Sequence, residues 1–259
     1  MVVVVLAAAL PVAGTGNILM PVWYTRVTQV GTGITSLQQI TEQNNFVFLL
    51  FGLILLLFVG ALMDYFPGDT GPRIVQGATV AALLIGTGSQ KKNRSHFFVS
   101  IVFVVLMLVM IVAGSLIDRA GFDYLHLLIL LSFLVWMTWL AVRQVLFTGS
   151  ITSNDIVGAI CIYMLLGMIW AILYLILAQI VPGAFNGVPH APWLENFSTA
   201  IYFSFVTITT LGYGDVSPAI PLARFLVIME AIIGVFYMAI LVASLIGVRM
   251  SIRDAERKQ

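Results

Sequence analysis

The sequence has 259 residues, of which 61% are hydrophobic and only 9% are charged, whereas soluble domains carry about 25% charged residues. With a mean hydropathy of +1.07, a water-soluble fold of this length could not bury the apolar surface of the chain, so lipid must form part of its surroundings. The formal net charge of +1 gives no indication of a nucleic-acid partner, and a single cysteine, Cys161, excludes an internal disulfide framework.

Residues 1–45 are predicted to form an N-terminal segment that is distinct from the membrane helices after it. Its start, MVVVVLAAALPVAG, has the apolar centre of a signal peptide but lacks a positively charged beginning. This apolar stretch is also short for a membrane span. A seventh span, an interfacial segment and an upstream extension of the reading frame all remain open interpretations, and the polar remainder is typical of a linker.

Six apolar runs follow, and each is a candidate for a membrane-spanning helix, which needs about 20 mostly apolar residues. They are residues 46–63, 74–88, 97–117, 124–147, 156–181 and 221–248. The second run is short and contains Gln76, so its ends are poorly defined. We expect a four-helix membrane domain over residues 46–150, a pore domain over 151–250 and a short cytoplasmic tail over 251–259.

A shorter amphiphilic run, residues 198–209, lies between the last two apolar runs. It is too short to span a bilayer, so we expect a re-entrant pore helix, whose start Asn196 or Ser198 could cap. The sequence thus predicts an all-α membrane protein with six transmembrane helices. A re-entrant pore helix and a selectivity-filter loop would lie between the fifth and the sixth.

The positions of Lys and Arg predict which side of the membrane each loop faces, because short cytoplasmic loops carry an excess of these residues. With six spans, one side receives Lys91, Lys92, Arg94, Arg143, Arg249, Arg253, Arg257 and Lys258. We therefore expect a multi-pass protein of the cell (inner) membrane with both termini in the cytoplasm. The loop after the re-entrant helix would then face outward.

That loop is the most distinctive part of the sequence and reads TITTLGYGDVSP. In hydrocarbon, non-helical backbone survives only where it is buried in protein or lines water. Gly212 and Gly214 permit backbone angles that other residues resist, so successive carbonyl groups can turn toward one axis. These carbonyls, with the Thr210 hydroxyl, can replace the water shell of a monovalent cation. Tyr213 can pack outward and hold the loop open, and an Asp215 carboxylate at the outer mouth would raise the local cation concentration.

The run from Thr209 to Asp215, Thr-Thr-Leu-Gly-Tyr-Gly-Asp, resembles the signature of the tetrameric potassium channels, whose usual core is Thr-Val-Gly-Tyr-Gly. Leu211 replaces the usual Val but supplies the same backbone carbonyl. The resemblance covers residues 156–250 and includes Gly234, where these channels place a hinge. More loosely, the six predicted spans resemble small bacterial ion-channel proteins.

This resemblance implies a potassium selectivity filter, with Thr209 supporting its entrance and Asp215 at its outer mouth. The filter residues would be Thr210, Leu211, Gly212, Tyr213 and Gly214, with K⁺ bound at the first four.

A filter of this kind needs four loops around one axis, and the sequence contains one such loop. Four chains should therefore assemble with fourfold symmetry. The carboxyl end of each pore helix would carry about −0.5 charge and stabilise a cation in a cavity below the filter. One stripe of the last helix could line that cavity: Gly234, Met238, Val242 and Ile246. Packing of the same stripe against the preceding span is the alternative.

Glu230 is the most unusual side chain of the predicted pore domain. A carboxylate inside a membrane is expensive and is by default a candidate functional site. It could hydrogen-bond behind the filter to Ser204 or Thr207. Its protonation would then change the stability of the filter or of the hinge and make conduction sensitive to pH. A purely structural role is the alternative interpretation.

These features predict a potassium-selective channel, not an enzyme, that conducts passively through a homotetrameric pore in the lipid bilayer and binds no cofactor beyond K⁺ as permeant ion. The fourth run offers Arg143 alone, and a steep voltage sensor needs several positive charges, so voltage gating is predicted to be weak or absent. Two alternatives remain. One is a potassium-uptake transporter, which usually carries four different repeats in one chain, and the other is a non-conducting regulatory subunit.

Overall fold

The computed structural model describes residues 45–62, 65–66, 70–88, 94–116, 120–147 and 153–257. The segment predicted for residues 1–45 lies outside this part of the chain, except for Asn45. The basic residues Lys91, Lys92 and Lys258 also lie outside it.

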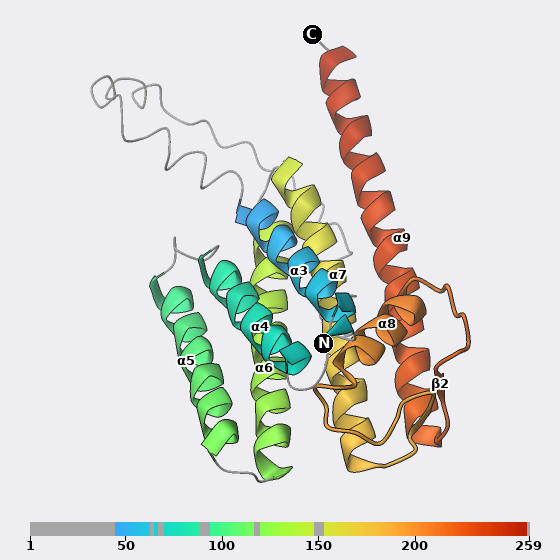
Figure 1. The fold of residues 1–259 in the computed structure, drawn as a ribbon. Coiled ribbons are helices and arrows are strands. Elements are labelled where there is room, and N and C mark those ends of the chain that lie inside the picture. The colour runs from blue at the N-terminus through green and yellow to red at the C-terminus, as the bar shows by residue number, and fades with distance from the viewer. Residues whose placement is uncertain are drawn as a thin grey trace. The chain divides into compact units, whose positions relative to one another are not determined.

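Seven α-helices and one short antiparallel strand pair make up the described chain (Figure 1). The helices are α3 (Asn45–Leu62), α4 (Thr70–Gly88), α5 (Arg94–Leu116), α6 (Ala120–Phe147), α7 (Ser153–Ile180), α8 (Phe197–Ile208) and α9 (Pro221–Arg257). The strands are β1 (Phe185–Asn186) and β2 (Ser217–Pro218). Each of the six predicted apolar runs is helical over most of its length, and the shorter run predicted between the last two is the helix α8. The re-entrant position of α8 in the membrane stays a prediction. The helix α9 continues through most of the predicted tail, as far as Arg257.

Four of these helices are long and apolar enough to cross a membrane: Arg94–Gly114, Phe122–Val145, Asn154–Ile180 and Pro221–Leu241. Both α3 and α4 are shorter apolar helices. The chain is accordingly an all-α, multi-pass membrane protein. The six-span topology itself stays a prediction, because α3 and α4 fall below the length of the other four.

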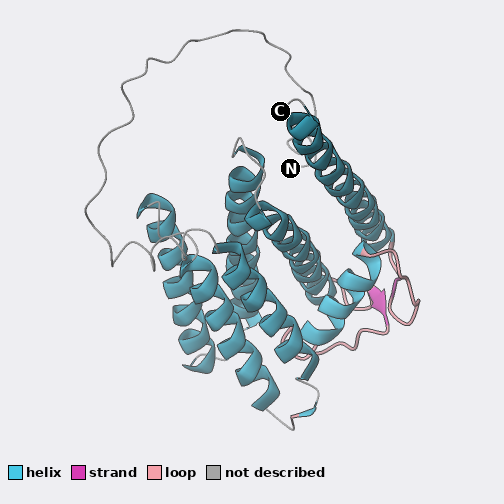
Figure 2. Ribbon diagram, turned by 90° about the horizontal axis from the view of Figure 1, so that it is seen from above, coloured by secondary structure: helices cyan, strands magenta, loops and turns pink. Residues whose placement is uncertain are grey.

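The helix α7 lies at the centre of the packing and contacts α3, α6, α8 and α9. The first four helices pack in succession, α3 against α4, α4 against α5 and α5 against α6. Seen from above, α9 stands at the edge of the group, beside α8 (Figure 2), and it contacts α7 as well. The approach of α3 to α7 is close at Gly158, where an added Cβ would lie 2.7 Å from the Phe46 ring. The two predicted membrane regions of one chain are thus packed together.

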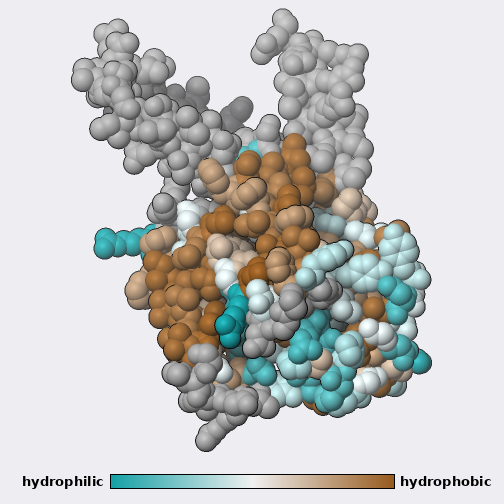
Figure 3. Space-filling model, viewed as in Figure 1, coloured by the Kyte–Doolittle hydropathy of each residue, from teal (hydrophilic) through white to brown (hydrophobic). Residues whose placement is uncertain are grey.

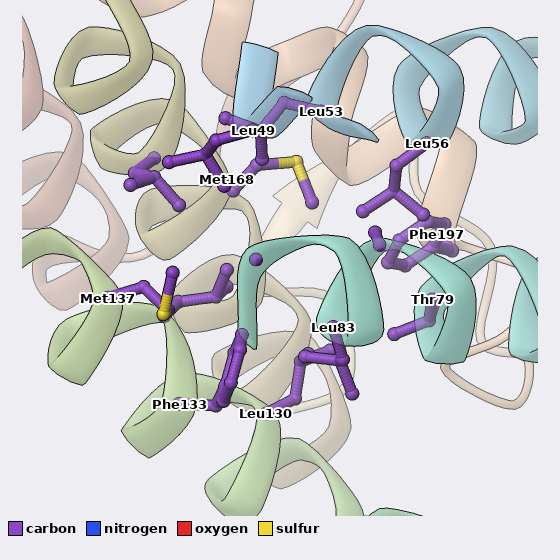
Figure 4. A pocket seen from close by; sticks show the side chains of 14 residues that line it. Leu49, Leu53, Leu56, Thr79, Leu83, Leu130, Phe133, Met137, Met168 and Phe197 are labelled. Atoms are coloured by element: carbon purple, nitrogen blue, oxygen red, sulfur yellow. The ribbon is translucent and has the colours of Figure 1, made fainter. Parts of the chain in front are cut away.

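A small apolar cavity lies among α3, α4, α6 and α7, and Figure 4 shows the side chains around it. Leu, Phe and Met side chains line most of it, and Thr79 contributes the one hydroxyl among these lining residues. Phe197, the first residue of α8, also reaches it. No lining residue carries a charge, so the surroundings of this cavity are apolar.

The surface separates into an apolar and a polar part. Figure 3 shows brown, apolar surface over the helices and paler or teal surface around the loops near α8 and β2. The helix α9 is the most exposed of the long helices, because 11% of its span Pro221–Leu241 is buried, against 72% of Asn154–Ile180 in α7. Its exposed face is apolar and includes Leu222, Phe225, Ile228, Ile232, Val235 and Phe236.

Candidate functional site

The short helix α8 directs its carboxyl end into the TLGYG loop. Its apolar side chains are buried against α7 and α9, which fixes a helix of only 12 residues in place. Asn196 occupies the N-cap position, as expected, but its side chain makes no capping bond. The Asn196 amide instead donates to the carbonyls of Pro189 (2.9 Å) and Ala191 (3.3 Å), so it holds the preceding loop against the helix start.

The last four carbonyl groups of a helix have no partner within it, and in α8 all four accept hydrogen bonds. The carbonyls of Phe205, Val206 and Thr207 accept from the loop that follows, and the Ile208 carbonyl accepts from the Tyr163 hydroxyl of α7. The bonds are Thr209 N–H to Phe205 O (3.2 Å), Thr210 N–H to Thr207 O (2.9 Å), Leu211 N–H to Val206 O (2.9 Å) and Gly212 N–H to Val206 O (3.2 Å). The Thr209 hydroxyl adds a bond of 2.6 Å to Phe205 O. The helix end and the start of the loop therefore form one hydrogen-bonded unit.

Backbone angles alternate in hand along the loop. The φ angles of Thr210, Gly212 and Gly214 are positive, at 60°, 58° and 86°, whereas Leu211 and Tyr213 have negative φ. Alternation of right- and left-handed residues places successive N–H groups on one side of a chain and the C=O groups on the other. The left-handed region is costly for Thr210, which has a Cβ, and such strain is often found at functional sites. The geometry suits a row of carbonyls that share one direction.

The end of the loop near Tyr213 and Asp215 is held by a pair of tyrosines. The Tyr202 ring of α8 stacks on the Tyr213 ring, with centroids 6.4 Å apart and an interplanar angle of 7°. The Tyr202 hydroxyl donates to Asp215 Oδ2 at 2.8 Å. This hydrogen bond, followed by backbone N–H bonds, lowers the pKa of the exposed Asp215 carboxyl below its ordinary value. Asp215 is therefore kept ionised at the loop mouth.

The chain after the loop is tied back by the strand pair. Phe185 pairs with Pro218 and Asn186 with Ser217. At Gly187, φ is +82° and an added Cβ would lie 2.6 Å from the Asp215 carbonyl, so only glycine allows this approach. The loop is thus fixed at both ends by contacts within one chain.

The inner side of the site is built where α9 crosses the end of α8. An added Cβ on Gly234 would lie 2.4 Å from the Ile208 carbonyl oxygen, so the two backbones touch at this glycine. The same carbonyl accepts a bond of 2.9 Å from the Tyr163 hydroxyl of α7. Tyr163 stacks on Tyr237 of α9, with ring centroids 5.7 Å apart. Gly234 therefore has a packing role, and α9 runs through it as one helix.

Glu230 lies one turn before Gly234 and is fully buried in the single chain. Its Oε1 lies 2.5 Å from the Ser204 hydroxyl of α8, so the predicted hydrogen bond to Ser204 is confirmed. Its Oε2 accepts a hydrogen bond from the Tyr174 hydroxyl of α7. Ser204 is also fully buried and lies 2.7 Å from the Gly167 carbonyl oxygen. One carboxyl group thus connects three helices.

The other members of the predicted stripe on α9 are less fully described. Met238 is 43% exposed in the single chain, which leaves it open to a cavity or to lipid. Val242 and Ile246 lie in α9, but their side chains fall outside the described part. The hinge at Gly234 and the cavity lining stay predictions.

Sequence reasoning missed the tyrosines that surround the loop. Tyr163 and Tyr174 are eleven residues apart, about three helical turns, so they share one face of α7. Glu230, Gly234 and Tyr237 follow the i, i+4, i+7 spacing of one face of α9. These shared faces are a weak signal in the sequence, because they do not say which partner each tyrosine hydroxyl reaches.

Comparison with known proteins identifies this region. Residues 158–250 match the family model described as ion channel. This part of the chain is therefore an ion channel pore domain, and the matched family is one of channels, not of enzymes.

The inward rectifier potassium channel Kirbac3.1 of Paramagnetospirillum magnetotacticum is 33% identical to the chain over 90 residues. Those residues are 35% of this chain and 28% of the relative, so the chain spans little more than a quarter of that protein's length. No solved structure was found to match.

Proposed function

We propose that this protein is a potassium-selective channel that conducts passively through a homotetrameric pore. The observation that carries the proposal is the alternation of positive and negative φ from Thr210 to Gly214 at the end of α8. Four such loops around one axis would present rings of carbonyl oxygens that replace the hydration shell of K⁺. The ions would bind at Thr210, Leu211, Gly212 and Tyr213, with Gly214 closing the filter and Asp215 attracting cations at its mouth.

The exposure of the pore helices supports assembly. In the single chain, Leu211 and Tyr213 are 55% and 67% exposed, although the start of their loop is hydrogen-bonded to the end of α8. The apolar face of α9 is uncovered as well. A second copy placed against this face would bury both surfaces, and repetition of the contact around a closed axis gives a tetramer.

The location follows from the distribution of charge. We infer a cell (inner) membrane protein whose α5 start, α6 end and α9 end face the cytoplasm, with the filter mouth outside. The amino terminus would share the cytoplasmic side.

Reconstitution into liposomes tests the proposal. Purified protein should release K⁺ much faster than Na⁺, without an energy source, and barium should block the flux. The matched variant is Gly212→Ala, because a side chain at φ of +58° is strained whatever the space around it. We expect this variant to lose selective flux while Gly77→Ala, on the exposed side of α4 with open space around it, retains flux.

The same experiment separates the alternatives. K⁺ uptake against its own gradient, driven by the gradient of another ion or by nucleotide hydrolysis, would support a transporter and overturn the channel. Absence of flux from well-folded tetramers under every condition would support a non-conducting regulatory subunit. A molecular mass in detergent of about 28.3 kDa, that of one chain, would overturn the tetramer.

A further inference from the structure

The carboxyl group of Glu230 is a feature of the pore domain that the proposed filter does not use. Glu230 is 0% exposed in the single chain, so its surroundings are complete without a partner subunit. It contacts Tyr174 of α7 and Ser204 of α8, and itself belongs to α9. The TLGYG loop lies between α8 and α9 in the chain, and α7 packs against both helices.

The hydrogen bonds around Glu230 require a count of protons. The Ser204 oxygen lies 2.7 Å from the Gly167 carbonyl and 2.5 Å from Glu230 Oε1. A serine hydroxyl has a single proton and a carbonyl has none, so Ser204 can donate to one of these oxygens and not to both. Tyr174 donates its own proton to Oε2. A proton is therefore missing from one short contact if Glu230 is ionised.

A proton on the Glu230 carboxyl group supplies the missing hydrogen-bond donor. Glu230 Oε1 then donates to Ser204, Ser204 donates to the Gly167 carbonyl, and Tyr174 donates to Oε2. Three contacts are served by three protons. Hydrogen bonds of a buried polar group that are all satisfied favour a single arrangement of the helices that make them.

The surroundings offer no countercharge to an ionised Glu230. The titratable groups that face it are Tyr174 and, farther away, Tyr163, both from α7. From α8 it meets the neutral Ser204. The Tyr174 ring is packed against Phe185 and Phe203, at centroid distances of 5.3 and 5.1 Å. In the part of the chain that the structure describes, Glu230 forms no ion pair, and an unpaired buried charge is strongly disfavoured.

We propose that Glu230, in its protonated form, is a positioning residue that fixes α8 between α7 and α9 and thereby holds the potassium filter in its selective geometry. Ser204 lies one turn before Ile208, and Glu230 one turn before Gly234. The proton-bearing contact and the close backbone contact therefore follow each other along the same crossing of α8 and α9, directly before the filter begins. Loss of the proton at alkaline pH removes one bond from this crossing and leaves a charge within it.

The conservative variant Glu230→Gln tests the idea, because its amide can donate to Ser204 and accept from Tyr174 at every pH. In liposomes, wild-type K⁺ flux and K⁺ over Na⁺ selectivity should fall as the pH is raised into the alkaline range. Glu230→Gln should keep both across the same range. Glu230→Ala and Ser204→Ala should lose about tenfold or more in selectivity already at neutral pH, the scale expected when a buried donor or acceptor is left unpaired.

Two exposed positions provide matched controls. Glu195→Gln removes an exposed carboxylate, and Ser132→Ala removes a hydroxyl that donates to the Leu128 carbonyl on the exposed side of α6. Both should leave the pH profile and the selectivity unchanged. An alkaline decline of the same size in wild type and Glu230→Gln would overturn the proposal.

Two further measurements do not depend on conduction, and this separates the proposal from the proposed function on which it rests. Infrared spectra should show a protonated carboxyl band at neutral pH that is absent from Glu230→Gln, and an unchanged band would overturn the protonated form. Amide hydrogen exchange of residues 197–214 should accelerate at alkaline pH in wild type beyond the acceleration in Glu230→Gln. Equal acceleration would overturn the positioning role, whether or not the protein conducts, whereas absent flux with both results as expected would overturn only the potassium channel.

Discussion

Gly234 shows how one missing side chain lets α9 touch the end of α8, directly before the proposed filter. A Cβ at this position would lie 2.4 Å from the Ile208 carbonyl oxygen and 2.8 Å from the Ile208 side chain. Backbone atoms cannot move aside as a flexible side chain can, so Gly234→Ala should push α9 away from the end of α8. We expect an overpacking cost of about 1–3 kcal/mol in the free energy of unfolding. Flux assays should also show reduced K⁺ selectivity.

Gly114→Ala is the control for this change, because Gly114 also lies in a helix but has open space where the Cβ would be. Alanine favours a helix over glycine, so this variant should be neutral or slightly stabilising. Equal behaviour of the two variants in thermal unfolding and in flux would mean that the contact between Gly234 and Ile208 does not hold the filter.

Asp215 gives a second prediction at the scale of single residues, and its sign follows from the hydrogen bond with Tyr202. That bond lowers the pKa of the carboxyl, so the charge at the mouth persists to a lower pH than an ordinary aspartate would allow. The stabilising contribution of the bond is present above the ordinary aspartate range and is lost as the pH falls through the lowered pKa.

In Tyr202→Phe the pKa of Asp215 should return toward its ordinary value. Conductance at low K⁺ concentration should then decline at a higher pH than in wild type, because protonation removes the attraction for cations. High salt should diminish the difference by screening. Single-channel recording across acid pH measures this, and identical acid profiles would remove the role of Tyr202.

At the scale of elements, α6 is tied to the loop before α8 by one tryptophan. Trp193 is 3% exposed, and its Nε1 donates to Asp123 Oδ1 at 3.2 Å. Its ring packs against His126 and Phe197, with centroids 4.8 and 6.2 Å away. The start of α6 and the start of α8 in one chain are thus joined.

Trp193→Ala should lower the free energy of unfolding by about 3–5 kcal/mol, the usual cost of removing a buried tryptophan. Trp139 on α6 is 45% exposed, so Trp139→Ala should cost much less. Denaturant unfolding in detergent, followed by circular dichroism, compares the two. Similar losses in both variants would show that the Trp193 contact does not stabilise the junction between α6 and α8.

The helices themselves were predictable from the sequence because lipid requires long apolar runs and every run became a helix. The end of α9 was not, since residues 249–257 are polar enough to suggest a tail, yet the helix continues to Arg257. A helix that has already begun gains one hydrogen bond for each residue added, so polarity alone does not end it.

The site was predictable only in part. The glycines of TLGYG indicated a loop whose carbonyls could turn toward a cation, and Glu230 stood out as an ionisable residue in an apolar run. The partners Tyr163, Tyr174 and Tyr202 were not, because an isolated tyrosine in a membrane helix has many possible contacts. Which carbonyl or carboxyl each hydroxyl reaches depends on how α7, α8 and α9 cross, and no local pattern specifies that crossing.

At the scale of the whole molecule, the arrangement of charge bears on what can open the pore. Between Asp123 and Arg143 the helix α6 contains no Lys, Arg, Asp or Glu. The cavity among α3, α4, α6 and α7 is lined without charge (Figure 4). A moving voltage sensor needs several positive charges within the field and polar partners along their path. The helix α6 carries Arg143 as its single Lys or Arg.

Arg143 is the one residue of α6 that could carry gating charge, and its position argues against this. It is exposed near the end of the helix, with its guanidinium 5.4 Å from the centre of the Trp139 ring. Moving one full charge through 100 mV is worth about 2.3 kcal/mol, and a charge already at the end of a span can cross only part of the field. We therefore expect current that changes gradually with voltage and is nearly the same in Arg143→Gln. Planar-bilayer recordings from both proteins test this: steep activation in wild type that Arg143→Gln abolishes would show that α6 does move in the field, and that the apolar interior of the helix group opens to let it pass.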